Sequence, residues 1–147
     1  MFAIGGRNNK HGPLSSIEKY DSVSNDWTVV CELPCGIHGH QAVALPDSIY
    51  ILGGSTGREQ SSAMWKLDPS TFEITCLPSM NIPRSDFTSM VSHNCNFIYA
   101  IGGLNSQQGA LNSVERFDLV LQQWSFVNPM KHPRHGHASS ISLTKLK

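Results

Sequence analysis

Three apolar runs in this chain each end in a Gly-Gly pair, and the pairs recur at a nearly constant interval. The pairs are Gly5-Gly6, Gly53-Gly54 and Gly102-Gly103. The steps are 48 residues between the first and second pairs and 49 between the second and third. A fixed period of this length predicts a repeat architecture, in which each unit buries its apolar faces against its neighbours.

Other residues keep the same period. An Asp follows each pair, an apolar residue precedes that Asp, and a second large apolar residue lies six positions after it. These sets are Tyr20, Asp21 and Trp27; Leu67, Asp68 and Ile74; and Phe117, Asp118 and Trp124. The motif His38-Gly39-His40 also returns as His135-Gly136-His137, 97 residues later.

These marks together resemble the kelch repeat. That family shows a double glycine after an apolar strand, an aromatic-Asp step and a Trp six residues further on, with a period of about 50 residues. The resemblance covers nearly all 147 residues in three copies. The middle copy departs most, with Leu67 and Ile74 in place of aromatic residues.

Each repeat is expected to form one four-stranded antiparallel blade. The run before each Gly-Gly pair is continuously apolar, which is typical of a strand buried on both faces. The next strand alternates, as in Ser113-Val114-Glu115-Arg116-Phe117. Trp27 and Trp124 on the fourth strand are expected to bury their rings between neighbouring sheets. The fold class is therefore all-β, a kelch-type β-propeller segment.

The repeats divide the chain at approximately 1–35, 36–82 and 83–132, with 133–147 expected to form the first strand of a further blade. Residue 1 already lies in the second strand of its blade. About three blades cannot close a ring, because propellers typically have about four to eight. The segment is therefore interpreted as an incomplete ring. The alternative is that residues 137–143 pair beside residues 1–4 of the same chain.

The composition excludes some functions. Lys+Arg and Asp+Glu are both 11, which argues against a nucleic-acid binder or an anionic-membrane binder. No apolar stretch of 18 residues is present, and a cytoplasmic protein is expected. Four cysteines without a disulfide framework are expected to be free thiols. Cys31, Cys35, His38 and His40 cluster, but their spacing is not a usual zinc pattern. No metal and no cofactor is predicted.

No catalytic motif points to an enzyme. The chain has no Gly-rich phosphate loop. Some kelch propellers are copper-radical oxidases, but Tyr50 and Tyr99 lie in apolar strands and Tyr20 lies at a blade-packing position. A kelch-type oxidase therefore remains only a distant alternative to a non-enzymatic protein.

Two glutamates on third strands suggest buried ion pairs. Glu18 and Glu115 lie near the end of their blades at which Arg84 and Arg134 begin the first strands. An Arg–carboxylate pair with bidentate geometry is therefore expected between strands or blades, in a structural role.

The polar loops on one face of the blades carry the recognition signal. The loops after the Gly-Gly pairs and the loops that lead to each first strand emerge on the same face, and binding residues concentrate on such loops. The predicted partner-binding residues are Arg7, Asn9, His38, Ser55, Arg58, Ser85, Leu104, Asn105, Arg134 and His135.

The resemblance implies a partner class. Kelch domains of this kind usually follow BTB and BACK domains and act as substrate receptors for cullin-RING ubiquitin ligases, holding a short peptide of the target on the loop face. That role would need BTB and BACK domains, which this chain lacks. Arg7 is expected to grip an acidic target residue. Binding to actin filaments, as other kelch proteins do, is the alternative.

Overall fold

The computed structural model describes residues 1–142, and those residues form strands, turns and loops with no helix. No helix within the described part of the chain is long and apolar enough to cross a membrane. The all-β fold class is therefore confirmed.

Three antiparallel four-stranded sheets and one short two-stranded ribbon make up residues 1–142. The first sheet contains β1 (Phe2–Ile4), β2 (Arg7–Asn8), β3 (Gly12–Asp21) and β4 (Asp26–Ile37). The second contains β5 (Gln41–Leu45), β6 (Ser48–Leu52), β7 (Met64–Leu67) and β8 (Ile74–Leu77). The third contains β9 (Thr88–Val91), β10 (Phe97–Ile101), β13 (Val114–Asp118) and β14 (Gln123–Val127). The ribbon is β11 (Leu104–Asn105) with β12 (Gly109–Ala110).

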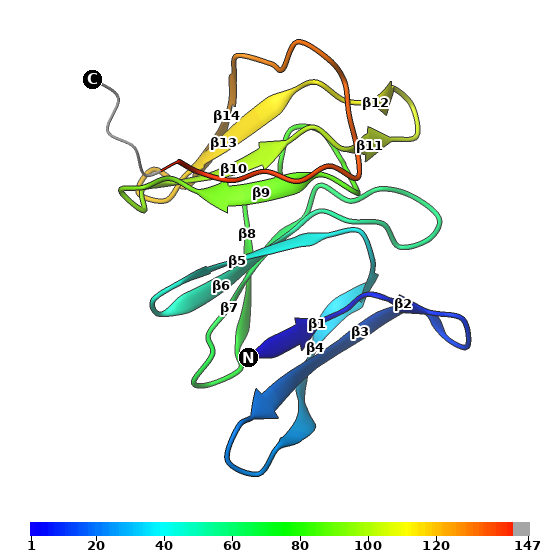
Figure 1. The fold of residues 1–147 in the computed structure, drawn as a ribbon, viewed down its shortest axis with the longest axis vertical. Helices are drawn as coiled ribbons and strands as arrows, with labels where there is room; N and C mark the ends of the chain where they lie inside the picture. The colour runs from blue at the N-terminus through cyan, green and yellow to red at the C-terminus, as the bar shows by residue number, and fades with distance from the viewer. Residues whose placement is uncertain (143–147) are drawn as a thin grey trace.

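The sheets are stacked one on another in chain order, with the first sheet and the third at opposite ends (Figure 1). The described residues do not close into a ring, as expected of an incomplete propeller. One apolar cluster, which includes Ile17, Ile37 and Trp65, fills the space between the first and second sheets. A second cluster, which includes Leu52 and Phe87, fills the space between the second and third.

Strand β6 shows how the sequence builds this stack. Tyr50 and Leu52 face the cluster shared with the third sheet, whereas Ile51 faces the cluster shared with the first. Successive side chains of a strand point to opposite faces, so a continuously apolar run supplies both clusters at once. The prediction that this run is buried on both faces is confirmed, because Ile51 and Leu52 are each 0% exposed.

The Gly-Gly pairs join each sheet to the loop that follows it. The second glycine donates its N–H to a carbonyl at or beyond the end of the last strand of its own sheet, over 2.8 to 2.9 Å. These bonds are Gly6 to Ile37, Gly54 to Arg84 and Gly103 to Arg134. Gly53 has φ +58, and a Cβ there would lie 2.7 Å from the Arg84 carbonyl oxygen. Glycine is therefore required by both the backbone conformation and the close approach.

The aromatic positions of the first and third repeats have the same geometry but different burial. Tyr20 and Trp27 lie 5.2 Å apart at an interplanar angle of 45°, and so do Phe117 and Trp124. Trp124 is partly buried against the core, and its indole N–H donates to the Pro78 carbonyl at 2.8 Å. Trp27 is 40% exposed, so the expectation that its ring is buried between sheets was wrong. The first sheet has no neighbouring sheet on that side within residues 1–142.

The prediction for the C-terminal segment also needs correction. Residues 133–142 run alongside the third sheet but form no strand, and residues 143–147 lie outside the described part of the chain (Figure 1). A strand needs a hydrogen-bonded partner, and none of the described strands pairs with this segment. The alternative pairing beside residues 1–4 is likewise not formed, since β1 pairs only with β3 there.

Acidification is expected to destabilise the fold through His40. Burial lowers the pKa of His40, a hydrogen bond to the Ile4 backbone partly opposes this, and His38 lowers it further. The unfolded chain therefore binds a proton more readily than the folded chain. The stabilisation is complete above the ordinary pKa of about 6.5 and is lost as the pH falls from there through the lowered folded value.

We expect the free energy of unfolding, measured with urea between pH 7.5 and pH 5, to decrease over this range. Phe87 packs against Gly53 as the His40 ring packs against Gly5, so His40→Phe should fit and should reduce the pH dependence. A residual slope is expected, because the pKa of His137 is also lowered by burial. An identical slope in the variant and the wild type would contradict this assignment.

Candidate functional site

The candidate site is the loop face, formed by two sets of loops. The Gly-Gly loops, which include β2 and the β11–β12 ribbon, are residues 7–11, 55–62 and 104–110. The linker loops are residues 34–40, of which 34–37 end β4, and residues 78–87 and 129–137. Paired backbone hydrogen bonds join His38 to Ser55 at 3.0 and 2.8 Å, and Ser85 to Leu104 at 3.0 and 2.7 Å. The two sets therefore emerge on one face, and each sheet contributes both.

The ten predicted binding residues differ in exposure. The exposed residues are Arg7, Asn9, Arg58, Arg134 and His135; the half-buried ones are His38 and Leu104; and the buried ones are Ser55, Ser85 and Asn105. The structure brings His38 together with Ser55, and Ser85 with Leu104, through the backbone. It does not bring Arg7 and Arg134 together, because Arg7 lies in β2 of the first sheet and Arg134 follows β14 of the third, and these sheets are at opposite ends of the stack (Figure 1).

The three buried side chains bond within the chain. Ser55 Oγ accepts from the Gly57 N–H at 3.0 Å, and Ser85 Oγ donates to the Asp86 carboxylate at 3.2 Å. Asn105 Oδ1 accepts from two following backbone amides, and its Nδ2 donates to the Pro83 carbonyl at 2.7 Å. These side chains shape the loops, and the exposed residues are the ones that a partner would contact.

Two grooves lie between successive Gly-Gly loops. The first groove, between the second and third sheets, is lined mainly by amide side chains and by the linker loop: Glu59, Gln60, Asn81, Ile82, Pro83, Asn105, Ser106, Gln107 and Gln108. The second groove, between the first and second sheets, is lined by Pro13, Cys35, Gly36, Thr56, Arg58 and Glu59. The Gln60 amide oxygen accepts from the Ser106 N–H at 3.0 Å and so links two loops across the first groove.

Sequence reasoning missed most residues of the first groove. Pro83 precedes Arg84 as Pro133 precedes Arg134, but no repeated motif singles out Asn81 and Ile82. Gln60 and Gln107 lie in Gly-Gly loops that differ in length and sequence, so their alignment across two sheets has no sequence signature. The repeat period predicted that the loops lie on one face, but it did not predict which side chains contact one another between the loops.

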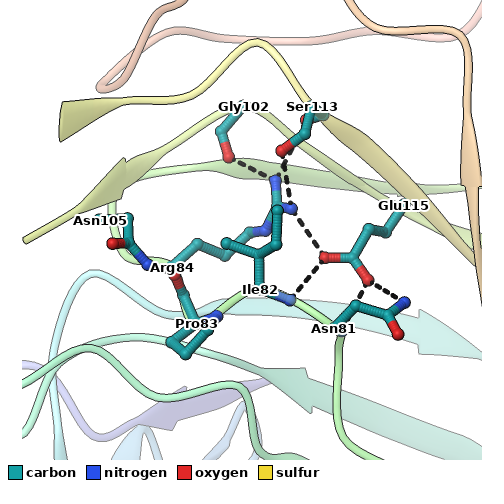
Figure 2. Close-up of polar contacts among 8 residues, drawn as sticks. All are labelled: Asn81, Ile82, Pro83, Arg84, Gly102, Asn105, Ser113 and Glu115. Carbon is teal, nitrogen blue, oxygen red and sulfur yellow. Dashed lines mark hydrogen bonds and ion pairs between the residues drawn. The ribbon is translucent and has the colours of Figure 1, made fainter. Parts of the chain in front are cut away.

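A buried arginine adjoins residues that line the first groove (Figure 2). Arg84 is 0% exposed and projects into the third sheet. Its guanidinium donates to the Gly102 carbonyl at 2.7 Å and to the Ser113 carbonyl and hydroxyl, each at 3.2 Å. It also donates to a Glu115 carboxylate oxygen at 2.8 Å. Arg84 therefore links a linker loop to both inner strands of the sheet that follows.

Glu115 is also 0% exposed, and its carboxylate shapes the groove above it (Figure 2). One oxygen accepts from the Asn81 backbone and side-chain amides, each at 2.7 Å, and the other accepts from the Ile82 N–H at 3.1 Å. The predicted ion pair of Arg84 with Glu115 is confirmed. Its predicted bidentate geometry was wrong, because one guanidinium nitrogen contacts one carboxylate oxygen while the backbone amides take the remaining acceptor sites.

Burial and pairing with Glu115 shift the pKa of Arg84 in opposite directions. Desolvation lowers the pKa of its guanidinium, and the adjacent Glu115 charge and hydrogen bond oppose that change. The second sheet uses apolar side chains instead: Ile37 and Trp65 occupy the positions equivalent to Arg84 and Glu115, and both are buried in the core. At these equivalent positions the chain therefore buries an ion pair in one sheet and apolar side chains in another.

The cysteine–histidine cluster does not form a metal site in the described region. Cys31, Cys35, Cys76 and Cys95 are free, and burial raises the pKa of Cys31. Across residues 1–142, no group of three or more His, Cys, Asp or Glu side chains is arranged to hold a metal ion.

Residues 1–146 match the KLHDC2/KLHL20/DRC7 Kelch-repeats domain. The chain belongs to the kelch-repeat family. The resemblance of its Gly-Gly, Asp and aromatic positions to that repeat is therefore confirmed.

Relatives of this kelch chain include proteins that carry a BTB domain by name. It is 32% identical over 127 residues to "Kelch repeat and BTB domain-containing protein 8" of Danio rerio, covering 84% of this chain and 20% of that protein. It is 34% identical over 135 residues to "Kelch-like protein 26" of the same organism, covering 89% and 22%. The chain thus spans about a fifth of the length of the curated relatives it matches.

The kelch fold is also seen in a solved structure. The chain superposes on the "Structure of YjhT" with a TM-score of 0.73 and 16% sequence identity. The superposition covers 91% of this chain and 50% of the other. At this identity the likeness concerns the fold alone, and it places the three sheets on half of a longer chain.

Removing the Glu115 carboxylate should destabilise the third sheet and the groove. Glu115→Ala leaves the Arg84 charge buried and unpaired, which costs about 3–5 kcal/mol in the free energy of unfolding. Urea denaturation monitored by circular dichroism measures this change. Glu73→Ala, which removes an exposed carboxylate, is the control and should stay within about 0.5 kcal/mol of the wild type. Equal stabilities of the two variants would show that the ion pair does not hold the sheet.

Proposed function

We propose that this kelch module binds a short acidic segment of a partner protein on the loop face. The observation that carries the proposal is the charge of that face. The exposed Gly-Gly loops contain Arg7, Lys10 and Arg58 but only one carboxylate, Glu59, although the whole chain is neutral. Basic residues gathered on rigidly held loops favour a ligand of opposite charge.

The grooves suit an extended peptide. Arg58 and Glu59 line the second groove, and amide side chains line the first. Amides can donate to and accept from a peptide backbone, whereas an exposed guanidinium can bind a carboxylate with two parallel hydrogen bonds. The second and third Gly-Gly loops are held by backbone bridges to linker loops, and Arg7 of the first pairs with Pro13, so little ordering is required on binding.

We further propose that, within a longer kelch protein, this module is the target-recognition part of an adaptor for a cullin-RING ubiquitin ligase. Its support is the relationship to proteins named for BTB and kelch domains together. The cullin contact would come from other domains, and this module would select the target.

Peptide arrays test the recognition proposal. The wild-type chain is expected to bind peptides that contain Asp and Glu. It is expected not to bind the same peptides when Asn and Gln replace those residues. Arg7→Ala and Arg58→Ala should each weaken binding about tenfold, because a charge-assisted hydrogen bond contributes about 1.5–3 kcal/mol. Lys66→Ala is the control, since Lys66 is an exposed cation on β7 outside the loops. Equal binding of acidic and neutralised peptides would exclude this ligand class.

The adaptor proposal needs a separate experiment. A fusion of this chain to a BTB and BACK segment is expected to capture a cullin and an acidic target together from lysate. Arg7→Ala with Arg58→Ala should release the target and leave the cullin bound. Loss of both, or of neither, would contradict a division of recognition between the two parts.

A further inference from the structure

The three linker loops are joined by a row of backbone hydrogen bonds, and the middle residue of this row is Asp86. The Asp86 N–H donates to the Gly39 carbonyl at 2.8 Å, and the Gly136 N–H donates to the Asp86 carbonyl at 2.7 Å. The three positions are equivalent, because each lies two residues after the carbonyl that accepts from a Gly-Gly pair. Asp86 therefore has a linker loop of this chain on each side.

The backbone at this position favours glycine, and only the second linker loop departs from that pattern. The φ angles of Gly39, Asp86 and Gly136 are +62, +52 and +62, a region that is unfavourable for a residue with a Cβ. Within residues 1–142 the other non-glycine residues with positive φ all lie in turns between paired strands: Asn25, Phe72, Cys95 and Gln122. A hairpin turn therefore does not account for the aspartate in the linker loop.

The Asp86 carboxylate has acceptor sites without a partner. Its Oδ2 accepts from the Ser85 hydroxyl at 3.2 Å. Its Oδ1 lies over Gly39, only 2.8 Å from the place that a Cβ of residue 39 would take. A carboxylate can accept about four hydrogen bonds, and no cation among residues 1–142 forms an ion pair with this one. Because Asp86 is half-buried rather than enclosed, its carboxylate can bind a positively charged group from outside.

Backbone bonds connect Asp86 to a basic Gly-Gly loop. His38 bridges Ser55, the first residue of the loop that contains the exposed Arg58. Gly39 follows His38 in the chain and accepts from the Asp86 N–H. One linker loop therefore holds both the loop of Arg58 and the Asp86 backbone. A peptide segment that crosses this part of the loop face passes a cation and then an anion.

We propose that Asp86 determines specificity on the loop face by binding a lysine or arginine side chain of the partner segment. The inference rests on the proposed binding of an acidic segment and adds a second requirement to it. The recognised segment carries a basic residue at a fixed spacing from its acidic residue. An ammonium or guanidinium forms charge-assisted hydrogen bonds with a carboxylate, and a guanidinium can contact both oxygens.

The same carboxylate would select against uniformly acidic segments. A second Asp or Glu placed at Asp86 would meet a charge of the same sign, which is unfavourable at an interface. Specificity often combines an attractive contact for the correct partner with a repulsive one for the wrong partner. Asp86 would supply both, whereas a glycine, as at positions 39 and 136, would supply neither.

A matched peptide series tests this requirement. Each peptide carries one acidic residue, and Lys, Arg, Gln or Glu is placed in turn at every spacing from it. Dissociation constants are measured by fluorescence anisotropy with the wild-type chain. At one spacing, we expect the Lys and Arg peptides to bind about tenfold more tightly than the Gln peptide, and the Glu peptide to bind most weakly. A preference confined to one spacing distinguishes a subsite from the general field of the face.

Asp86→Asn removes the charge and keeps both the side-chain shape and an acceptor for Ser85. This variant should bind the Lys, Arg and Gln peptides equally and should bind the Gln peptide at least as tightly as the wild type does. Asparagine adopts positive φ readily, so the urea midpoint of the variant should not fall below that of the wild type. Asp47→Asn is the control, since Asp47 is exposed in the turn between β5 and β6, and it should retain the preference.

Three results would overturn the proposal: equal binding of the Lys, Arg and Gln peptides at every spacing by the wild type, an unchanged preference in Asp86→Asn, or a preference lost in both variants. A lower urea midpoint with weaker binding of every peptide by Asp86→Asn would also overturn it, because Asp86 would then hold the loop rather than a ligand. The proposed function fails by a different result. If replacing the single acidic residue by Asn or Gln leaves binding unchanged, the acidic-segment proposal is wrong, whereas a missing Lys preference among bound acidic peptides contradicts only the role of Asp86.

Discussion

The hydrogen bond from the second glycine of each pair to the next linker loop is the constraint on which the rest of the structure depends. It fixes where the last strand of each sheet ends, and at Gly54 and Gly103 a Cβ would lie too close to a neighbouring backbone, whereas Gly6 has open space there. At Gly54 the acceptor is the carbonyl of Arg84, whose side chain is bonded into the third sheet. A single residue thus connects the backbone of one repeat to the interior of the next.

This connection also shapes the loop face. The Glu115 carboxylate receives Arg84 from below and the amides of Asn81 and Ile82 from the groove side, so a buried charge holds residues that line an exposed surface. A buried carboxylate with unpaired oxygens would be costly in free energy. Here the guanidinium and the backbone amides together provide hydrogen bonds to both oxygens. The loop face is therefore supported by the stack rather than by flexible loops alone, as the proposed peptide-binding surface would require.

Much of this architecture was predictable from the sequence, because the period of the Gly-Gly pairs sets the number of sheets and the apolar runs set the buried strands. The Arg84–Glu115 pair was also predictable, because Arg84 recurs as Arg134 and Glu115 recurs as Glu18. Its geometry was not, because it depends on the amides of Asn81 and Ile82, which have no repeated signature. The exposure of Trp27 and the lack of a strand at residues 133–142 were missed for one reason. Repeat position predicts a buried ring and a paired strand, but both form only where a neighbouring sheet or strand is present in the described chain.

Residue-resolved hydrogen exchange tests the central claim most directly, namely that the buried ion pair secures the bond between repeats. Gly54 and Gly6 make equivalent bonds to Arg84 and Ile37, but only the first of these acceptors belongs to an ion-paired residue. In Glu115→Gln, under conditions in which the chain stays folded, exchange at the Gly54 amide is predicted to accelerate while exchange at the Gly6 amide does not. Unchanged protection at Gly54, or equal acceleration at both glycines, would contradict the claim.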